Sequence, residues 1–270
     1  MTPHRSYIIS CTPRSGSHLL ADGLASTRLA GQPTERFPRF ARGIELTRAQ
    51  RDAMVTDAPP EESYDAEQDA EYTKKIIELG TSPNGVFGLT LHWFQVNDAV
   101  RRIREYIKSK SDAPNEVFSL AFPNLSYIWL RRRDKVAQAV SWFKAIQTGQ
   151  YLKVRGTDLG SQSAPAAATV EFDYGKIRSY WSALRSFENG WEHFFEEHRL
   201  TPLVIYYEDL AKGYESSIRQ SLVFLGLGDG NVSIAPPRHE KAADEQSLLW
   251  VERFRSMQAS ARPRPVRHTQ

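Results

Sequence analysis

Four short apolar runs stand out along the chain, which has 270 residues. They cover residues 7–10, 86–91, 126–130 and 202–207, where aliphatic, β-branched and aromatic side chains predominate. None of these runs alternates strictly between polar and apolar positions, which is typical of parallel strands whose two faces are both covered. The pattern therefore predicts strands of a mostly parallel sheet.

Helical periodicity lies between these runs. Apolar residues spaced three or four positions apart predict a helix, with Asp134 as its N-cap, at Val136, Val140, Phe143 and Ile146. Similar spacing predicts a long helix over 177–194 and another over 218–225, and residues 18–25 have helical composition. Because strands alternate with helices and no break in composition divides the chain, we expect one α/β domain with a central parallel sheet flanked by helices.

The composition, 40% hydrophobic and 25% charged, is that of a globular protein and excludes a collagen-like or wholly disordered chain. Cys11 is the single cysteine, which excludes an internal disulfide framework and a cysteine-rich zinc site. The apolar runs are too short to span a membrane, and the N-terminus lacks the apolar core of a signal peptide. We therefore expect a cytoplasmic protein without a transmembrane segment.

The net charge of +3 hides an uneven distribution. Five arginines and no acid lie between residues 253 and 270, and without these five the rest of the chain has a net charge of −2. A near-neutral body argues against nucleic-acid partners. We expect a domain over residues 1–257 and a flexible, basic Pro/Arg-rich tail over 258–270. Residues 57–71 contain seven acids and no Lys or Arg, which predicts a solvated loop or, alternatively, a lid over a site.

A turn of small residues, C-T-P-R-S-G-S over 11–17, joins the first predicted strand to its helix. Parallel α/β sheets bind ligands at this end of their strands. Gly16 permits close approach of the backbone to an anion, and the N–H groups of the following helix N-terminus are directed toward it. Arg14 adds a charged fork, and Ser15 and Ser17 add hydroxyl donors. The spacing is not that of a Walker loop, which disfavours an ATPase or GTPase. The alternative is an ordinary turn with a surface arginine.

A second basic cluster, Arg131–Arg133, follows the third predicted strand and precedes the helix that carries Ser141. Consecutive arginines at a strand end repel one another unless an anion is bound there; a solvated strand exit is the alternative. Two anion sites at two strand ends of one sheet predict a ligand with phosphates at both ends, such as a 3′,5′-bisphosphate nucleotide.

These residues resemble motifs of the sulfotransferases. The turn over 12–17 is similar to their 5′-phosphosulfate loop, Arg132 with Ser141 is similar to their 3′-phosphate motif, and Y-E-D-L over 207–210, expected to close the last strand, is also common in them. The closest resemblance is to the bacterial family typified by mycobacterial trehalose 2-sulfotransferase. The shared pieces occur in order along the chain: G-Q-P-T-E-R-F (31–37), P-N-G-V-F-G (83–88), Q-A-V-S-W-F-K-A-I-Q-T (138–148) and W-V-E-R-F (250–254).

The resemblance implies a P-loop-like nucleotide-binding sulfotransferase fold. It also implies transfer of a sulfuryl group, without a metal, from 3′-phosphoadenosine 5′-phosphosulfate (PAPS) to a hydroxyl of a carbohydrate or glycoside-like molecule. The donor-binding residues that it implies are Thr12, Pro13, Arg14, Ser15, Gly16, Ser17, His18, Arg132, Ser141 and Lys241. Arg133 is the alternative to Arg132. Family members can be homodimers, so a homodimer is a further expectation.

Two residues compete for the role of the base that deprotonates the acceptor. The resemblance implies Glu35, while His92 follows the second predicted strand, where cytosolic sulfotransferases place a catalytic histidine. The family usually has a lysine where this chain has Thr90, so Arg14 is expected to do more to stabilise the leaving oxygen.

The aromatic residues Phe37, Trp93 and Trp142 are expected to contact the acceptor together with Glu35, with core packing as the alternative. The acceptor itself is open: a non-carbohydrate alcohol such as a lipid or secondary metabolite is the alternative to a sugar. Two other functions also remain open, a different phosphotransfer enzyme and a non-catalytic nucleotide-binding protein.

Overall fold

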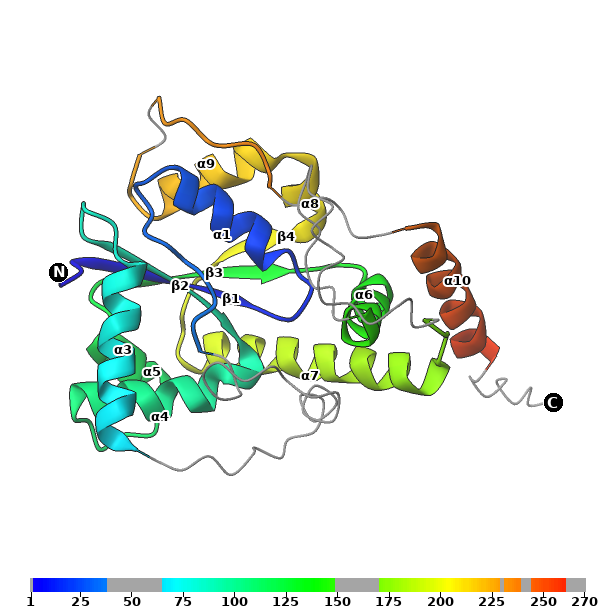
Figure 1. The fold of residues 1–270 in the computed structure, drawn as a ribbon, viewed down its shortest axis with the longest axis horizontal. Helices are drawn as coiled ribbons and strands as arrows, with labels where there is room; N and C mark the ends of the chain where they lie inside the picture. The colour runs from blue at the N-terminus through cyan, green and yellow to red at the C-terminus, as the bar shows by residue number, and fades with distance from the viewer. Residues whose placement is uncertain (1, 38–64, 149–169, 229–230, 239–243, 261–270) are drawn as a thin grey trace, which may run out of the picture.

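The computed structural model describes residues 2–37, 65–148, 170–228, 231–238 and 244–260. Its centre is a sheet of parallel strands in the order β2-β1-β3-β4 (Figure 1). The strands are β1 (Arg5–Cys11), β2 (Val86–His92), β3 (Leu125–Arg131) and β4 (Leu203–Tyr206). Each coincides with one of the apolar runs, so the predicted α/β architecture with a central parallel sheet is confirmed.

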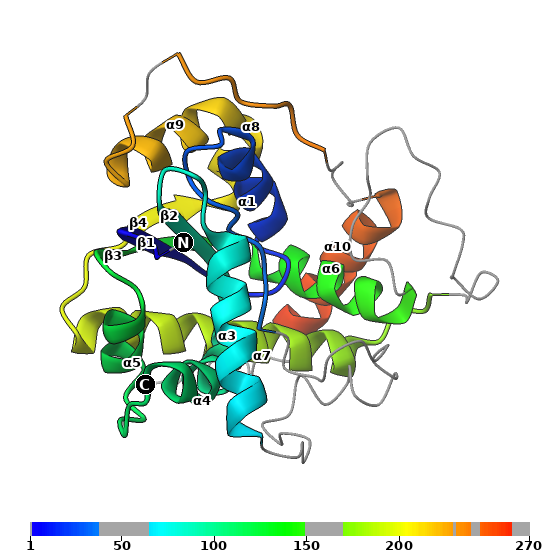
Figure 2. The same cartoon turned by 60° about the vertical axis from the view of Figure 1, so that its left-hand side comes forward.

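Helices cover both faces of the sheet, as the two views in Figures 1 and 2 agree. One face carries α1 (Ser17–Ser26), α8 (Tyr207–Lys212) and α9 (Tyr214–Phe224). The other face carries α3 (Ala66–Gly80), α4 (Val96–Ile107), α5 (Pro114–Ala121) and α7 (Tyr174–Glu197), with the short 3₁₀ helix η1 (Trp93–Gln95) leading into α4. Beyond the carboxyl ends of the strands lie α6 (Lys135–Thr148) and α10 (Glu245–Ser260).

Burial follows the alternation of side chains along each strand. In β1, Tyr7 and Ile9 pack with the helices α1 and α9, whereas Ile8 packs with the helices on the opposite face. Two hydrophobic clusters therefore sandwich the sheet, and strands buried on both faces need the continuous apolar sequence that predicted them. A third cluster is formed by α6, α7 and α10, and it includes Trp142, Phe143 and Trp250.

The helix α6 begins where the sequence predicted. The Ala137 N–H donates a hydrogen bond to Asp134 Oδ1 at 3.0 Å, which satisfies one of the N–H groups that a helix start leaves without a backbone partner. Lys144 of α6 forms an ion pair of 2.7 Å with Asp244 beside the start of α10. The helix that carries Ser141 is thus fixed at its N-terminus by its cap and along its length by α10.

The acidic segment 57–71 differs from the prediction of a solvated loop. Residues 66–71 form the first turns of α3, with Asp65 as the N-cap that accepts from the Gln68 N–H at 3.0 Å. Asp69 is buried and accepts hydrogen bonds from Arg101 and Arg102 of α4. The loop prediction is therefore wrong for 66–71, because arginines distant in sequence neutralise this part of the acidic run. Residues 57–64 lie outside the described residues.

Two further predictions concern the end of the chain. Tyr207 does not close the last strand but begins α8, so the expectation for Y-E-D-L is wrong. The helix α10 continues to Ser260, three residues into the predicted tail, and 261–270 lie outside the described residues. Within the described ranges, no helix is long and apolar enough to cross a membrane.

Candidate active site

The turn after β1 has the backbone of an anion-binding loop. Gly16 caps the N-terminus of α1 with a φ of 91°, a left-handed conformation that side chains disfavour. A Cβ at this position would lie 2.6 Å from the ring of Tyr207, the first residue of α8. Glycine therefore permits both the backbone angle and the close packing of the loop against α8. The N–H groups at the start of α1 face the loop and suit an anion there.

Gln138 of α6 holds this loop from the other side. Its side chain is fully buried, and its Nε2 donates to Thr12 Oγ1 at 2.9 Å and to the Pro13 carbonyl at 2.6 Å. Thr12 and Pro13 thus connect the loop to α6, because Thr12 Oγ1 and the Pro13 carbonyl both accept hydrogen bonds from Gln138. These contacts make the loop a fixed part of the domain core.

Arg14 connects the two motifs that the sequence analysis treated separately. Its Nε donates a hydrogen bond to Ser141 Oγ of α6 at 3.0 Å. The Arg14 carbonyl accepts from Arg132 Nη1 at 3.1 Å. The turn after β1 and the basic cluster after β3 therefore meet in one site.

The consecutive arginines after β3 have three different environments. Arg131 is paired with Glu188 of α7 at 3.0 Å, and Arg133 is exposed and forms two hydrogen bonds with Asp209 at 2.8 and 2.7 Å. Arg132 alone of the three turns toward the loop. The structure corrects the sequence argument that the whole cluster needs an anion, because protein carboxylates neutralise two of the arginines. Of the two alternatives, Arg132 contacts the loop and Arg133 contacts Asp209; a role of either in phosphate binding stays a prediction.

Two polar atoms beside the loop are buried without a hydrogen-bond partner among the described residues: Ser15 Oγ and Arg132 Nε. Native proteins rarely leave such atoms unpaired, so each calls for an explanation such as a ligand or ion. Burial lowers the pKa of Arg132, against the attraction of Tyr207, Glu208 and Asp134. The donor set of Ser15, Arg132 and the glycine-containing turn fits a phosphorylated ligand.

Ser17 is the buried first residue of α1, and His18 follows it with an exposed side chain. The charge of His18 contributes to lowering the pKa of Glu35. The loop and the expected base therefore belong to the same electrostatic environment. Lys241, the last predicted donor-binding residue, lies outside the described residues.

Glu35 and His92, the two alternative bases, are in contact. His92 Nε2 lies 3.2 Å from Glu35 Oε2, and Gln95 Nε2 donates to Glu35 Oε1 at 2.5 Å. The other nitrogen of His92, Nδ1, lies 3.3 Å from Cys11 Sγ. The four side chains form a continuous row that begins at the base of the loop and ends at η1.

The ionisation of this row follows from its contacts. Burial raises the pKa of Glu35, but the charge of His92, the hydrogen bonds from His92 and Gln95, and the charge of His18 outweigh burial and lower the pKa to about 2. Burial lowers the pKa of His92, but the hydrogen bonds to Cys11 and Glu35 and the charge of Glu35 raise it well above its ordinary 6.5. At neutral pH the pair is therefore a carboxylate beside an imidazolium.

Thr90, which stands where the family usually has a lysine, anchors the segment that carries Glu35. Its Oγ1 donates to the Pro33 carbonyl, and its N–H donates to the Thr34 carbonyl at 3.3 Å. Glu35 and Thr90 form an isolated parallel bridge at the outer edge of β2. This bridge brings Glu35 beside the end of β2, where His92 lies.

The aromatic residues expected to contact the acceptor are largely packed inside the protein. Phe37 and Trp142 are 0% and 2% exposed within two different hydrophobic clusters, which agrees with the alternative of core packing; contact of either residue with the acceptor stays a prediction. Trp93 is half-buried and packs edge-to-face on Trp191 with centroids 5.1 Å apart. Phe94 is half-buried and stacks on the His92 ring with centroids 5.4 Å apart, so it contacts the Glu35–His92 pair.

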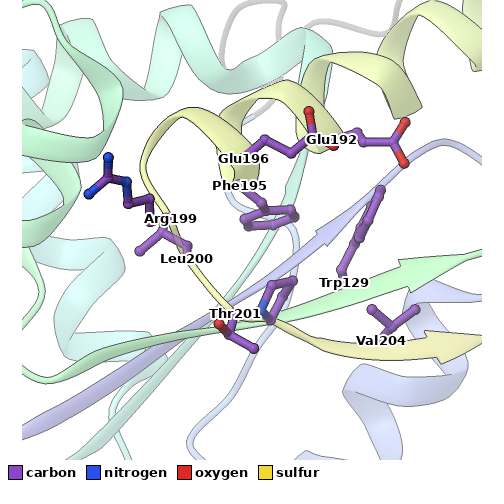
Figure 3. Close-up of a pocket in the computed structure, with 9 residues that line it drawn as sticks. Trp129, Glu192, Phe195, Glu196, Arg199, Leu200, Thr201 and Val204 are labelled. Atoms are coloured by element: carbon purple, nitrogen blue, oxygen red, sulfur yellow. The ribbon is translucent and has the colours of Figure 1, made fainter.

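A cavity of about 550 Å³ lies elsewhere, beside β4 and the end of α7 (Figure 3). Trp129, Phe195 and Val204 surround it, and Thr201 and Pro202 at its border precede β4. It therefore lies toward the amino end of this strand, away from the carboxyl ends that hold the loop. None of the candidate site residues lines it.

Within the described residues, no group of three or more His, Cys, Asp or Glu side chains is arranged to hold a metal ion. That the transfer reaction needs no metal ion stays a prediction.

Sequence reasoning missed Cys11, Gln95, Gln138 and Tyr207 as members of this site. A register signal was available for one of them: Cys11 and His92 are the last residues of adjacent parallel strands, and they are aligned in the sheet. Gln138 and Gln95 are polar residues within apolar patterns, and such positions suggest a buried hydrogen bond. Tyr207 is the first residue of the Y-E-D-L motif, and the sequence alone indicates no role for it in the site.

The strand order and the loop define a parallel α/β protein with a glycine-containing turn between its first strand and the following helix. Residues 6–257 match the family model described as Stf0 sulphotransferase; the chain belongs to this family and is a sulfotransferase.

Similar proteins include the trehalose 2-sulfotransferase of Mycolicibacterium smegmatis, 28% identical over 93% of this chain and 94% of that protein. The trehalose 2-sulfotransferase of Mycobacterium tuberculosis is 26% identical over 93% of this chain and 95% of that protein. The crystal structure of a sulfotransferase from Alicyclobacillus acidocaldarius covers 96% of this chain and 94% of its own, with 12% identity and a TM-score of 0.49.

Proposed function

We propose that the protein transfers a sulfuryl group from PAPS to a hydroxyl of a sugar or glycoside-like molecule. The observation that carries this proposal is the meeting of two anion-binding motifs through Arg14, which contacts both Ser141 and Arg132. A single site with two groups of anion-binding donors suits a nucleotide with phosphates on both its 5′ and 3′ positions. When bound, PAPS supplies the sulfuryl group on its 5′-phosphate.

In this proposal the turn after β1 binds the 5′ end of the donor. Ser15 Oγ, the N–H groups at Gly16 and Ser17, and the Arg14 guanidinium stabilise negative charge on the leaving phosphate. Arg14 carries the positive charge at this point, since Thr90 supplies none. As in phosphoryl transfer, most of the catalysis then comes from positioning and charge stabilisation.

The 3′-phosphate is assigned to Arg132 and Ser141. Arg132 has a buried Nε without a partner in the described parts of the chain, and its Nη1 is already oriented by the Arg14 carbonyl. Ser141 Oγ accepts from Arg14 and can donate its own proton to a phosphate oxygen. Tyr207 supports Arg132, whose guanidinium carbon lies 4.8 Å from the ring centroid.

Glu35 is assigned as the base. Its carboxylate is accessible, with a side-chain exposure of 30%, whereas the His92 side chain is 6% exposed and covered by Phe94. The acceptor hydroxyl can therefore reach Glu35 more readily than His92. The two mycobacterial relatives carry the name trehalose 2-sulfotransferase, which favours a sugar acceptor over a lipid or other alcohol. The cytoplasmic location and the homodimer stay predictions.

A thermal-shift comparison of adenosine 3′,5′-bisphosphate, ADP and GDP tests the donor. Binding to the folded state alone at 100 times Kd stabilises a protein by about 2.7 kcal/mol, which is readily measured. We expect the bisphosphate to stabilise the protein and the two diphosphates to have little effect. Selective stabilisation by ADP would contradict the proposal, and no shift with any of the three would favour a scaffold without catalytic function.

The transfer itself is tested by incubating the protein with PAPS and a panel of trehalose, glucosides and aliphatic alcohols. Mass spectrometry should detect the gain of one sulfo group on a sugar. The Arg14→Ala variant is the control for transfer that depends on the site. Sulfation of the alcohols alone would overturn the sugar assignment and leave the donor assignment intact.

A further inference from the structure

Cys11 and His92 form one end of the row of side chains that also contains Glu35 and Gln95. Cys11 and His92 are aligned as the last residues of the adjacent parallel strands β1 and β2. The Cys11 thiol is buried and has two acceptors within reach: His92 Nδ1 at 3.3 Å and the Leu91 carbonyl at 3.7 Å. A thiol has a single proton, so it can donate to only one of them at a time.

The acceptor to which the Cys11 thiol donates depends on the charge state of His92. When Nδ1 carries a proton, it donates toward the sulfur, and the thiol donates to the Leu91 carbonyl. When Nδ1 has lost its proton, the thiol can turn and donate to Nδ1. In both states Nε2 retains its proton toward Glu35 Oε2, because two acceptors facing each other at 3.2 Å would repel.

We propose that His92 is a positioning residue that, with Cys11, adjusts the strength of Glu35 as the base: loss of the His92 Nδ1 proton converts Glu35 from a weak base to a competent one without breaking their contact. This inference rests on the proposed function, since it assumes that Glu35 deprotonates the acceptor.

The surroundings support one dominant ionisation for this pair. Among the described residues, Cys11 from β1 and Glu35 from the segment after α1 contact His92, and His18 from α1 acts on Glu35. From η1, the Gln95 side chain accepts from the His92 backbone N–H at 2.8 Å and donates to Glu35, and it does not titrate. At pH values between the low pKa of Glu35 and the raised pKa of His92, Glu35 is therefore a carboxylate and His92 an imidazolium. The two groups titrate as a coupled pair.

The reaction step balances with this assignment. The acceptor oxygen forms a bond to sulfur, and the bond between sulfur and the bridging phosphate oxygen breaks, with its electron pair remaining on the phosphate. The acceptor proton passes to Glu35. Before this step the Nδ1 proton of His92 has passed to solvent, so the positive charge that weakens Glu35 is absent when the carboxylate accepts its proton.

Titration of ¹⁵N-labelled histidine by NMR tests the pair without any acceptor. The His92→Gln variant identifies the His92 signals. We expect His92 to lose its proton at a midpoint above 6.5, and to do so as the Nε2–H tautomer. In Glu35→Gln the midpoint should fall by about one to two pH units, because a charge-assisted hydrogen bond is lost. The control Glu116→Gln, on the exposed part of α5, should leave the midpoint unchanged.

The pH dependence of kcat/KM, with PAPS and trehalose, tests the consequence. Wild-type activity should fall about tenfold per pH unit below the His92 midpoint. In His92→Gln this fall should occur only in the carboxylate range, at about pH 4–5. An unchanged pH profile in this variant, a neutral Nδ1–H tautomer, or a midpoint insensitive to Glu35→Gln would overturn the proposal. Absence of transfer to trehalose would instead count against the proposed sugar acceptor, and the NMR titration would still decide the role of the pair.

Discussion

Arg132 offers the sharpest test of the donor site because its neighbour Arg133 provides a matched control. Arg132 lies against the loop with a buried Nε, whereas Arg133 points outward to Asp209. We predict that Arg132→Ala weakens the binding of adenosine 3′,5′-bisphosphate far more than the binding of AMP. We expect Arg133→Ala to change neither affinity by more than about twofold, since exposed ion pairs contribute little.

The magnitude follows from the two kinds of contact that Arg132 makes. Hydrogen bonds to a charged phosphate contribute about 1.5–3 kcal/mol, which corresponds to a loss of about 10- to 150-fold in affinity. The hydrogen bond from Nη1 to the Arg14 carbonyl supports the loop for both nucleotides, and its loss costs about 0.5–1.5 kcal/mol. AMP lacks a 3′-phosphate and should therefore show only this smaller loss.

Isothermal titration calorimetry at one fixed salt concentration measures both affinities, and the melting temperature shows whether each variant is folded. Arg132→Lys is a useful second variant, because it retains the charge and loses the planar fork that binds a phosphate. Equal losses for the bisphosphate and AMP would refute the assignment of Arg132 to the 3′-phosphate. An effect of Arg133→Ala as large as that of Arg132→Ala would refute the orientation of the two side chains.

Two other substitutions test the loop and the helical layer. Gly16→Ala should weaken bisphosphate binding by at least about tenfold, as measured by calorimetry. The left-handed backbone costs a residue with a side chain about 1–2 kcal/mol, and the new methyl group collides with Tyr207. Unchanged affinity would contradict the loop geometry. Asp69→Ala should lower the free energy of unfolding by about 1–3 kcal/mol in chemical denaturation, because the buried Arg102 loses one carboxylate partner and keeps Asp98. The control Asp112→Ala, whose side chain is 79% exposed, should cost less than about 1 kcal/mol; similar losses for both would contradict the burial argument.

The sheet could be predicted from the sequence because its strands are buried on both faces, which leaves continuous apolar runs. The helix α3 could not, because its first turns are acidic and give no local sign of burial. Asp69 pairs with Arg101 and Arg102, more than thirty positions along the chain. Charges that are neutralised by distant partners are the part of a fold that local patterns describe least well.

The candidate site, like the fold, could be predicted only in part from the sequence. The turn around Gly16 and the arginine beside it were recognisable from local chemistry, but the sequence left Glu35 and His92 as alternatives. The structure joins them, since the Glu35–Thr90 bridge places the carboxylate beside the end of β2. Trp142 resembled an acceptor contact from its sequence position and is core, because α7 and α10 cover it.

The loop after β1 is held by residues that lie far from it in the sequence. Gln138 lies 126 positions beyond Thr12, and Trp191, whose indole N–H donates to the Cys11 carbonyl at 3.0 Å, lies 180 positions beyond Cys11. A chain that ends before α7 therefore has the loop sequence and Gln138 but lacks Trp191. The geometry of the loop therefore depends on tertiary contacts from α6 and α7, and the turn sequence alone does not fix it.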